Sequence, residues 1–344
     1  MKILIDIGHP GHVHFFRNFI KSAEKNGYEF KIVARERECV LDLLKYYKIL
    51  FVKRKGYKGL LGKIKGLFTI NYKLYRIAKK FKPDVFMGVS SPYAAHIAWF
   101  LRKKSFIFTD TEHAKEQHKI FMPFCTKVIV PSCFTGKFSK KKEIRYNSYH
   151  EFAYLRSNYF KPNPKVLSEL GLKEKDKFFV IRFVSWDASH DVGQKGLKLN
   201  DKKKIIELLE RHGKVLISSE TTLDEEFEKY RISVPPEKIH DLLYYSTMYI
   251  GEGGTMASES SVLGTPAIYT NPLCMGYISE EEKKYGLLFQ STNIDQVIKK
   301  VEAWLGNKNL NKDWQKKRKQ LLNDKIDLTK WMVDFVERCN ISRK

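Results

Sequence analysis

Residues 251–266 read Gly-Glu-Gly-Gly-Thr-Met-Ala-Ser-Glu-Ser-Ser-Val-Leu-Gly-Thr-Pro, a glycine-rich turn that opens into a helix of small residues. The apolar run Met248–Ile250 before the turn predicts a short buried strand, and Ala267–Tyr269 after it predicts the next strand. The Gly-Thr-Pro at residues 264–266 ends the helix. A strand, a glycine turn and a helix in this order predict an α/β fold with an anion site, because the free N–H groups and the dipole of a helix N-terminus favour negative charge.

The same segment supplies the predicted contacts to a nucleotide diphosphate. Gly253 and Gly254 let the backbone approach a diphosphate closely, since they carry no Cβ atom. Thr255 and Met256 follow in the first helical turn, and Glu259 lies one turn further along. A carboxylate at that position can accept hydrogen bonds from the hydroxyls of a ribose.

Apolar runs alternate with helical segments along the whole chain, which predicts two doubly wound α/β halves. The predicted strands of the first half are Ile3–Ile5, Phe30–Val33, Val85–Met87, Phe106–Phe108 and Val128–Val130. Those of the second half are Phe178–Ile181, Val215–Ile217, Met248–Ile250 and Ala267–Tyr269. The polar, proline-bearing stretch 159–164 is the expected hinge, so the predicted domains are residues 1–160 and residues 161–325.

Three segments carry a resemblance to a known architecture. Residues 251–266 resemble the donor site of GT-B glycosyltransferases and of the non-hydrolysing UDP-N-acetylglucosamine 2-epimerases. Residues 1–16 resemble the first strand and Gly-His loop of the peptidoglycan N-acetylglucosaminyltransferase. With Arg-Phe-Val-Ser-Trp-Asp at residues 182–187, the chain is identified as a member of a prokaryotic GT-B-like family long catalogued as a domain of unknown function. The resemblance implies GT-B architecture, two Rossmann-like domains facing a cleft, with a C-terminal helix in residues 326–344 that crosses back to the first domain.

The resemblance also implies transfer of a sugar from a UDP-linked donor to an acceptor hydroxyl, which needs a general base. His12 is the first candidate because the ordinary pKa of histidine suits proton transfer at neutral pH, and His14 is its alternative. Glu112, just past the fourth strand, is the other candidate base. Each of the three also has a structural interpretation, as a packed or solvated histidine or as a carboxylate at a helix N-terminus.

On the donor side, Arg182 ends a buried strand and is expected to grip a phosphate, although pairing with a carboxylate would also explain it. Ser219 and Glu220 are expected near the ribose or phosphate, and Ile239 near the base. The sequence shows no clustered metal-ligand motif, so neither a metal ion nor another cofactor is expected.

The epimerase is the open alternative, because the resemblance covers it equally. Its chemistry eliminates and re-adds UDP through a glycal, with an Asp after the third major N-terminal strand and a His after the first strand of the second domain. Here these loops read Gly-Val-Ser-Ser at residues 88–91 and Ser-Trp-Asp at residues 185–187. Loss of both groups favours glycosyl transfer over epimerisation. The expected acceptor is a cell-envelope polysaccharide or a lipid-linked molecule.

The net charge of +24 indicates an anionic partner or surface. Nucleic acid is one alternative, but the basic residues form no known nucleic-acid-binding motif, so it is not expected. The segment Lys53–Lys82 contains no acidic residue, and its apolar residues recur at helical spacing: Leu60, Ile64, Leu67, Leu74, Ala78 and Phe81. A basic amphipathic helix fits contact with an anionic membrane, or else packs its apolar stripe on the core and leaves a solvated basic face.

The expected compartment is the cytoplasm, with peripheral contact at the inner face of the cell membrane. The chain has no apolar run of transmembrane length and begins directly with a strand instead of a signal peptide. Its five cysteines are odd in number and scattered, which predicts reduced thiols and no disulfide framework.

Overall fold

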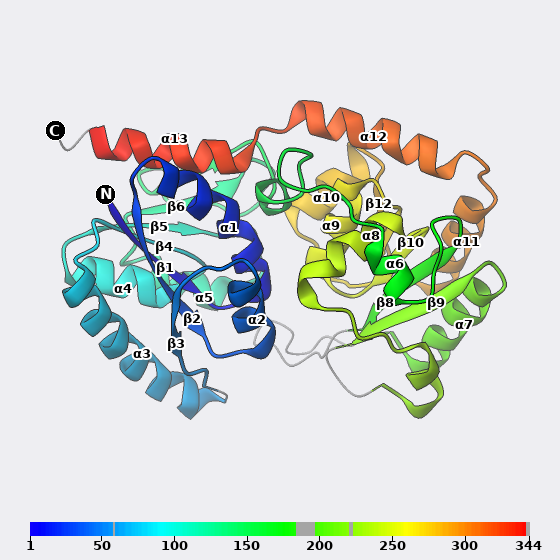
Figure 1. Ribbon diagram of the computed structural model, residues 1–344, viewed down its shortest axis with the longest axis horizontal. Coiled ribbons are helices and arrows are strands. Elements are labelled where there is room, and N and C mark those ends of the chain that lie inside the picture. Colours follow the sequence, from blue (N-terminus) through cyan, green and yellow to red (C-terminus); the bar gives the residue numbers. More distant parts are fainter. Residues whose placement is uncertain (58, 184–196, 220–222, 342–344) are drawn as a thin grey trace. The chain divides into compact units, whose positions relative to one another are not determined.

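The computed structural model describes residues 1–57, 59–183, 197–219 and 223–341. The chain divides into two compact units. Unit 1 comprises Met1–Tyr159 and Ile326–Lys344, and unit 2 comprises Phe160–Lys325. Each unit is built on its own parallel sheet (Figure 1).

In the described part of unit 1, seven strands pair in the order β3-β2-β1-β4-β5-β6-β7. They are β1 (Lys2–Ile7), β2 (Glu29–Arg35), β3 (Phe51–Arg54), β4 (Val85–Val89), β5 (Lys104–Phe108), β6 (Lys127–Pro131) and β7 (Glu143–Tyr146). All neighbouring pairs are parallel. The chain winds outward from β1 to one edge and from β4 to the other, as in doubly wound sheets, so the carboxyl ends of all strands meet at one edge.

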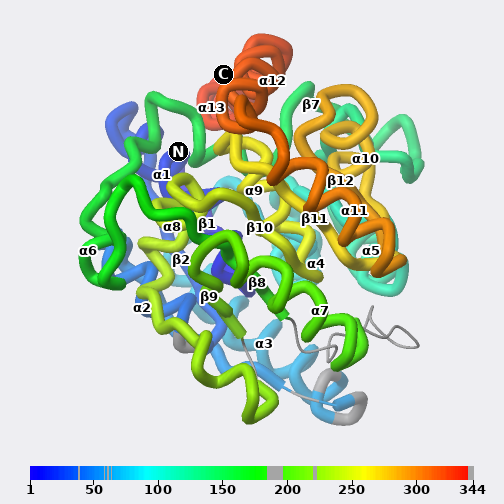
Figure 2. Tube along the Cα trace, turned by 90° about the vertical axis from the view of Figure 1, so that its right-hand side faces the viewer, coloured from blue at the N-terminus to red at the C-terminus, as the bar shows by residue number. Residues whose placement is uncertain are grey.

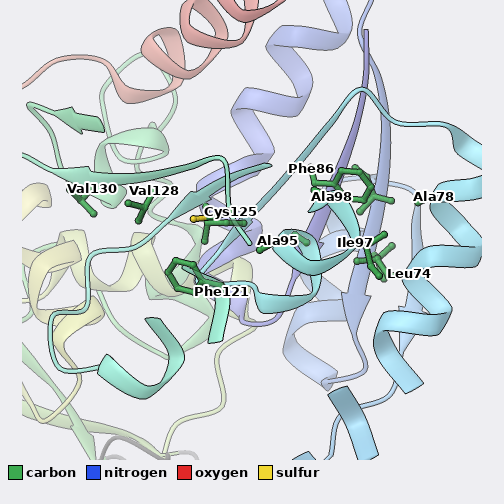
Figure 3. Packing of buried hydrophobic residues seen from close by; sticks show 14 of the residues in the cluster. Leu74, Ala78, Phe86, Ala95, Ile97, Ala98, Phe121, Cys125, Val128 and Val130 are labelled. Atoms are coloured by element: carbon green, nitrogen blue, oxygen red, sulfur yellow. The ribbon is translucent and has the colours of Figure 1, made fainter. Parts of the chain in front are cut away.

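The helices of unit 1 form two packed groups. Helices α1, α2 and α13 contact one another through α1, while α3, α4 and α5 contact one another in series. Their bounds are α1 (Pro10–Lys25), α2 (Glu38–Tyr46), α3 (Leu60–Phe81), α4 (Pro92–Phe100), α5 (Lys115–Phe121), the 3-10 helix η1 (His150–Ala153) and α13 (Leu328–Ile341). Between the second group and the sheet lies a core of buried apolar side chains to which α3 contributes Leu74 and Ala78 and α4 contributes Ala95 and Ile97 (Figure 3).

Helix α3 differs from the single apolar stripe that the sequence predicts. Leu74 and Ala78 are buried against the core, but Ile64 is 50% exposed. Phe68 and Tyr72, at the following i+4 positions, are 73% and 64% exposed. The apolar residues of α3 therefore lie on two faces, one in the core and one at the surface.

In the described part of unit 2, five parallel strands pair in the order β12-β11-β10-β8-β9, which can be followed across Figure 2. They are β8 (Phe178–Phe183), β9 (Lys214–Ser219), β10 (Met248–Gly251), β11 (Ala267–Tyr269) and β12 (Leu288–Gln290). The helices are α6 (Lys165–Glu169), α7 (Leu199–Glu210), η2 (Glu225–Tyr230), η3 (Pro236–Lys238), α8 (Ile239–Tyr245), α9 (Gly254–Leu263), α10 (Gly276–Lys283), α11 (Ile294–Leu305) and α12 (Leu310–Asp324). Helix α9 packs against α8, α10 and α12, so its side chains from Met256 to Leu263 are all buried.

All the strands predicted from the sequence lie within observed strands, so the predicted α/β class with two parallel sheets is confirmed. The predicted stop of α9 is confirmed as well, since Gly264 has φ +81° and caps the helix. The positive φ favours glycine, and a Cβ atom there would in addition displace the ends of the Arg318 and Gln315 side chains, which lie 2.7 Å from its position. None of the described helices is long and apolar enough to cross a membrane.

Candidate functional site

The N-terminus of α9, where the sequence predicts an anion site, directly follows strand β10. Strand β10 ends at Gly251, and Gly253 caps the helix without a side-chain hydrogen bond. The first intrahelical bond at this end runs from the N–H of Ala257 to the carbonyl oxygen of Gly253 (3.2 Å). The N–H groups of Gly254, Thr255 and Met256 precede that bond and therefore have no acceptor inside the helix.

Two glycines of this turn are fixed by close packing. A Cβ atom on Gly254 would overlap the end of Met275 and lie 3.1 Å from the hydroxyl of Tyr277. A Cβ atom on Gly251 would lie 2.8 Å from the carbonyl oxygen of Arg182 on the neighbouring strand β8. At Gly251 the neighbouring backbone leaves no room for a Cβ atom, and at Gly254 the ends of two side chains fill the space where a Cβ atom would lie.

Glu259 lies in the second turn of α9 and is held by a histidine of α8. His240 Nε2 and Glu259 Oε1 are 2.8 Å apart, and their side chains are only 2% and 5% exposed. The ring of Phe160 packs edge-on against His240. His240 was not among the residues predicted for the site, although a histidine one residue after Ile239 was visible in the sequence.

Arg182 and Ser218 occupy paired positions at the ends of β8 and β9. Arg182 Nη1 donates to Ser218 Oγ (3.0 Å). The buried Tyr249 lies near both Arg182 and the acids Glu259 and Glu252. Burial raises the pKa of its hydroxyl strongly, the charge of Arg182 lowers it, and the two acids raise it. The guanidinium of Arg182 thus belongs to the same charged group of side chains as Glu259.

The remaining donor residues predicted from the sequence lie around this group or outside the described residues. Ser219 is the half-buried last residue of β9, and Ile239 is the half-buried first residue of α8. Met256 is buried and Thr255 is exposed. Glu220 and Trp186 lie outside the described residues.

Glu252 is a buried residue of the turn that sequence reasoning missed. Its carboxylate accepts from the backbone N–H of Leu197 (2.7 Å), and its carbonyl oxygen accepts from Asn271 Nδ2 (2.9 Å). Both bonds run to residues far away in the sequence. Glu252 therefore connects the glycine turn to two other loops. Contacts over such sequence separations cannot be recognised from a local sequence pattern.

In unit 1, His12 lies in the loop and first turn that follow β1. The N–H of Gly8 donates to His12 Nδ1 at 3.3 Å, a long and weak bond. Burial lowers the pKa of His12 well below 6.5, with further lowering by His9 and His150, and Asp110 opposes these effects only in part. His12 is therefore a neutral imidazole at neutral pH.

Asp110 and His150 join His12 at the carboxyl edge of this sheet. His150 Nδ1 lies 2.8 Å from Asp110 Oδ2, and Thr111 donates to Asp110 Oδ1 (3.0 Å). Burial opposes ionisation of Asp110, but the charge and hydrogen bond of His150 outweigh it and keep the pKa of Asp110 below its ordinary value. The three side chains come from loops that follow β1, β5 and β7.

The two alternative bases predicted from the sequence lie elsewhere. His14 is two residues from His12, about 200° around the helix, so it faces away. It is buried and packs against the rings of Tyr154 and Tyr47. Glu112 accepts from the N–H of Thr135 (3.0 Å), which ties its loop to residue 135.

Within the described part of the chain, no group of three or more histidine, cysteine or acidic side chains is arranged to hold a metal ion. The expectation that the site works without a cofactor stays a prediction.

Comparison with known proteins shows a shared fold. A UDP-GlcNAc 2-epimerase from Neisseria meningitidis, solved bound to UDP-GlcNAc, superposes with a TM-score of 0.73 at 14% identity, over 98% of this chain and 100% of that one. The spinosyn rhamnosyltransferase SpnG, solved with spinosyn aglycone, superposes with a TM-score of 0.59 at 11% identity, over 99% and 100% of the two chains. At these identities the likeness shows the fold alone.

In sequence, the chain is 27% identical to an uncharacterized protein of Methanocaldococcus jannaschii over 326 residues, which is 90% of this chain and 93% of that protein. The family model described as protein of unknown function (DUF354) matches residues 1–340. The chain therefore belongs to the DUF354 family, with a fold shared by UDP-GlcNAc 2-epimerases and GT-B glycosyltransferases.

Proposed function

We propose that this protein is a glycosyltransferase that moves a sugar from a UDP-linked donor to a cell-envelope polysaccharide or a lipid-linked acceptor. The observation that carries the proposal is the start of α9, where a close-packed glycine turn presents backbone N–H groups. Such a terminus suits a diphosphate, and a structural neighbour is described with UDP-GlcNAc bound.

On the donor side, the diphosphate would lie at Gly253, Gly254, Thr255 and Met256, with Arg182 as the charged partner. Glu259 would accept from the ribose hydroxyls, and the hydrogen bond to His240 would keep its carboxylate in one orientation. Helix dipole and guanidinium would together stabilise the departing diphosphate without a metal ion.

On the acceptor side, His12 is the proposed base. Its low pKa keeps the ring neutral, and the weak bond from Gly8 leaves Nδ1 available after a small rotation. The ionised Asp110 would stabilise the imidazolium that forms on proton transfer. Glu112 remains the alternative base, although its bond to Thr135 gives it a structural role.

The second candidate is a UDP-N-acetylglucosamine 2-epimerase. It is favoured by the higher TM-score of the Neisseria meningitidis epimerase, 0.73 against 0.59 for the rhamnosyltransferase. Against it stands Ser90, which occupies the loop where the resemblance implies an acid and bonds Thr109 Oγ1 (3.0 Å) instead. The loop at residues 185–187, where the resemblance implies a histidine, lies outside the described residues.

A membrane-facing surface would bring a lipid-linked acceptor to unit 1. We define the aromatic face as Ile64, Phe68 and Tyr72 of α3 with Trp99 and Phe100 of α4. Trp99 is 60% and Phe100 63% exposed, and the ring of Phe100 contacts Tyr75 of α3, so the two helices form one surface. Exposed apolar groups of this size indicate an interaction site.

The charge around the aromatic face favours an anionic bilayer as its partner. Exposed basic residues of α3 flank it at positions Lys65, Lys73, Arg76, Lys79 and Lys80. Apolar rings that enter the headgroup region, bordered by lysines, are typical of peripheral membrane binding. We therefore propose a cytoplasmic protein that works at the inner face of the membrane and does not bind nucleic acid.

The donor assignment is tested by titration calorimetry with UDP. Glu259→Gln keeps a hydrogen-bond acceptor for His240 but removes the charge, and should weaken UDP binding by about 1.5–3 kcal/mol, the usual effect of losing charged hydrogen bonds. The exposed Glu225→Gln is the control and should bind as the wild type does. Equal affinity in all three proteins would remove the assignment of the ribose site.

The reaction is tested by proton NMR of UDP-GlcNAc and the enzyme in D2O without acceptor. Inversion at C2 breaks the C2–H bond, so an epimerase would form the C2 epimer and replace that hydrogen with deuterium. A transferase should leave C2 unchanged and consume the donor only when an acceptor is added. Acceptor-independent epimerisation would establish the second candidate.

A further inference from the structure

Three arginines gather at the carboxyl edge of β2 and β3 in unit 1. Arg35 is the last residue of β2 and Arg54 the last residue of β3, and the two are register partners on neighbouring parallel strands. Arg37 caps α2 two residues later. Burial lowers the pKa of the half-buried Arg35, and the charges of Arg54 and Arg37 lower it further. Arg35 is therefore close enough to Arg54 and to Arg37 to be repelled by each of them, while Tyr93 opposes this effect only in part.

Arg54 is compensated within the fold. Its Nε and Nη2 donate to the two carboxylate oxygens of Asp6 at 2.7 and 3.2 Å, in a pair that is almost fully buried. Ser91 Oγ donates to the same carboxylate (2.6 Å), and the guanidinium lies over the ring of Tyr93. Both oxygens of Asp6 are thus engaged, so this acid is not available to Arg35.

Arg35 has no such compensation. Among the residues that the structure describes, no acid pairs or hydrogen-bonds with its guanidinium, and Glu36 beside it in sequence is exposed. Like charges at register positions of neighbouring strands destabilise a sheet, and partial burial of an uncompensated cation adds a desolvation cost. The guanidinium of Arg35 lies directly beside Gly56, since a Cβ atom on that glycine would come within 2.6 Å of Arg35 Nε.

We propose that Arg35 and Arg54 bind a phosphate group of the acceptor. A phosphate carries up to two negative charges, and its oxygens can accept from two guanidinium groups at once. The anion would supply the charge that Arg35 lacks and relieve the repulsion between the arginines. A single planar carboxylate would supply only one charge for the same set of donors.

The position of the cluster relates it to the proposed base. Arg54 Nη2 lies 3.6 Å from the position of a Cβ atom on Gly8, and the N–H of Gly8 donates to His12. The phosphate site and the proposed base therefore share one loop. Because it rests on the proposed function, this inference narrows the acceptor to a molecule with a phosphate near the hydroxyl that receives the sugar, either a phosphorylated sugar or a phosphate-linked lipid.

The test is titration calorimetry with inorganic pyrophosphate at low ionic strength, with and without saturating UDP. Arg35→Gln should bind pyrophosphate about 10- to 100-fold more weakly than the wild type, as expected for loss of a charged, bidentate donor. Arg35→Lys should recover part of the affinity. Lys53→Gln removes one charge from the exposed position next to Arg54 and is the matched control, which should bind within about twofold of the wild type.

The outcomes separate the site from the proposed function. Equal pyrophosphate affinity in wild type and Arg35→Gln would overturn the inference. If Arg35→Gln lost UDP affinity to the same extent as pyrophosphate affinity, Arg35 would belong to the donor site, and the inference would also be overturned. Failure of the wild type to bind UDP would count against the proposed function, while the comparison of the Arg35 and Lys53 variants would still decide the phosphate site. Thermal unfolding without ligand checks folding, and Arg35→Gln should be at least as stable as the wild type.

Two further arms identify the source of the phosphate. A sugar 1-phosphate and a short prenyl phosphate are titrated in place of pyrophosphate. Preference for the first indicates a soluble phosphorylated sugar, and preference for the second a phosphate-linked lipid. With either ligand, Arg35→Gln should bind more weakly than the wild type. Equal affinity in the two proteins would contradict the inference.

Discussion

Replacing Glu281 with glutamine should stabilise unit 2 at neutral pH. Glu281 lies on α10, is fully buried, and its Oε1 accepts from Ser258 Oγ of α9 (2.6 Å). Burial raises its pKa from 4.5 to about 8, and the hydrogen bond from Ser258 opposes this shift only in part. Glu281 is therefore mostly protonated in the folded protein at pH 7 and ionised in the unfolded chain.

The size of the effect follows from proton linkage. Between the unfolded pKa of 4.5 and the folded pKa of about 8, the folded state holds a proton that the unfolded state has released. The free energy of unfolding therefore falls as pH rises through this interval, by about 1.4 kcal/mol per pH unit, and no further above the folded pKa. From pH 5 to pH 7, ionisation of Glu281 in the unfolded chain should lower the free energy of unfolding by about 2–3 kcal/mol. Glu281→Gln avoids this loss because glutamine does not titrate.

Scanning calorimetry across this pH range measures the difference. The unfolding temperature of unit 2 in Glu281→Gln should rise relative to the wild type by roughly 5–10 °C between about pH 5 and pH 7, by the usual conversion for a domain of this size. Glu282→Gln is the control, a neighbouring acid on the same helix whose Oε1 accepts from the N–H of Gln290. Parallel pH dependence in the wild type and Glu281→Gln would refute the reasoning, because it would mean that Glu281 ionises normally.

Three other predictions concern unit 1. Substituting His12 with Ala should reduce turnover by about 10²–10⁴-fold with little change in UDP affinity. Asp110→Asn should also reduce turnover. Steady-state kinetics that show unchanged turnover in His12→Ala would exclude His12 as the base. Since the pKa of His12 is well below 6.5, the acidic limb of the wild-type pH–rate profile should also lie below that value. Phe68→Ser with Trp99→Ser should weaken sedimentation with anionic vesicles, which in the wild type should fall with salt; equal binding to neutral vesicles, or none to either kind, would leave α3 as a solvated basic face.

The sequence was most informative where a pattern is local. The long apolar strands and the glycine turn at residues 251–254 are recognisable within a few neighbouring residues, so the α/β class and the start of α9 were predicted correctly. Strands β3, β7 and β12 were missed. They are only four, four and three residues long, and β3 and β7 read Phe-Val-Lys-Arg and Glu-Ile-Arg-Tyr. Such segments become strands because a partner strand is present, which is a tertiary effect.

The candidate site was harder to predict because its groups meet across long sequence separations. Asp6 and Arg54 form a pair across 48 residues, and His150 reaches Asp110 from the loop after the unpredicted strand β7. The two histidines could not be distinguished from sequence for a different reason. His12 and His14 look equivalent in sequence, but a helix turns about 100° per residue and sends His14 into an aromatic cluster.

The buried polar residues of α9 hold this helix against its neighbours, which would keep the proposed anion site at its N-terminus rigid. Ser258 is bonded to Glu281 of α10, and Glu259 to His240 of α8, so the helix is held from two sides by hydrogen bonds as well as by packing. Buried polar groups stabilise a fold less than apolar groups of the same volume would, but their hydrogen bonds allow only one orientation of the helix. The side chains of Met275 and Tyr277 fill the space beside Gly254. A diphosphate at the proposed site would therefore meet N–H groups on a helix whose position is already set by packing and hydrogen bonds.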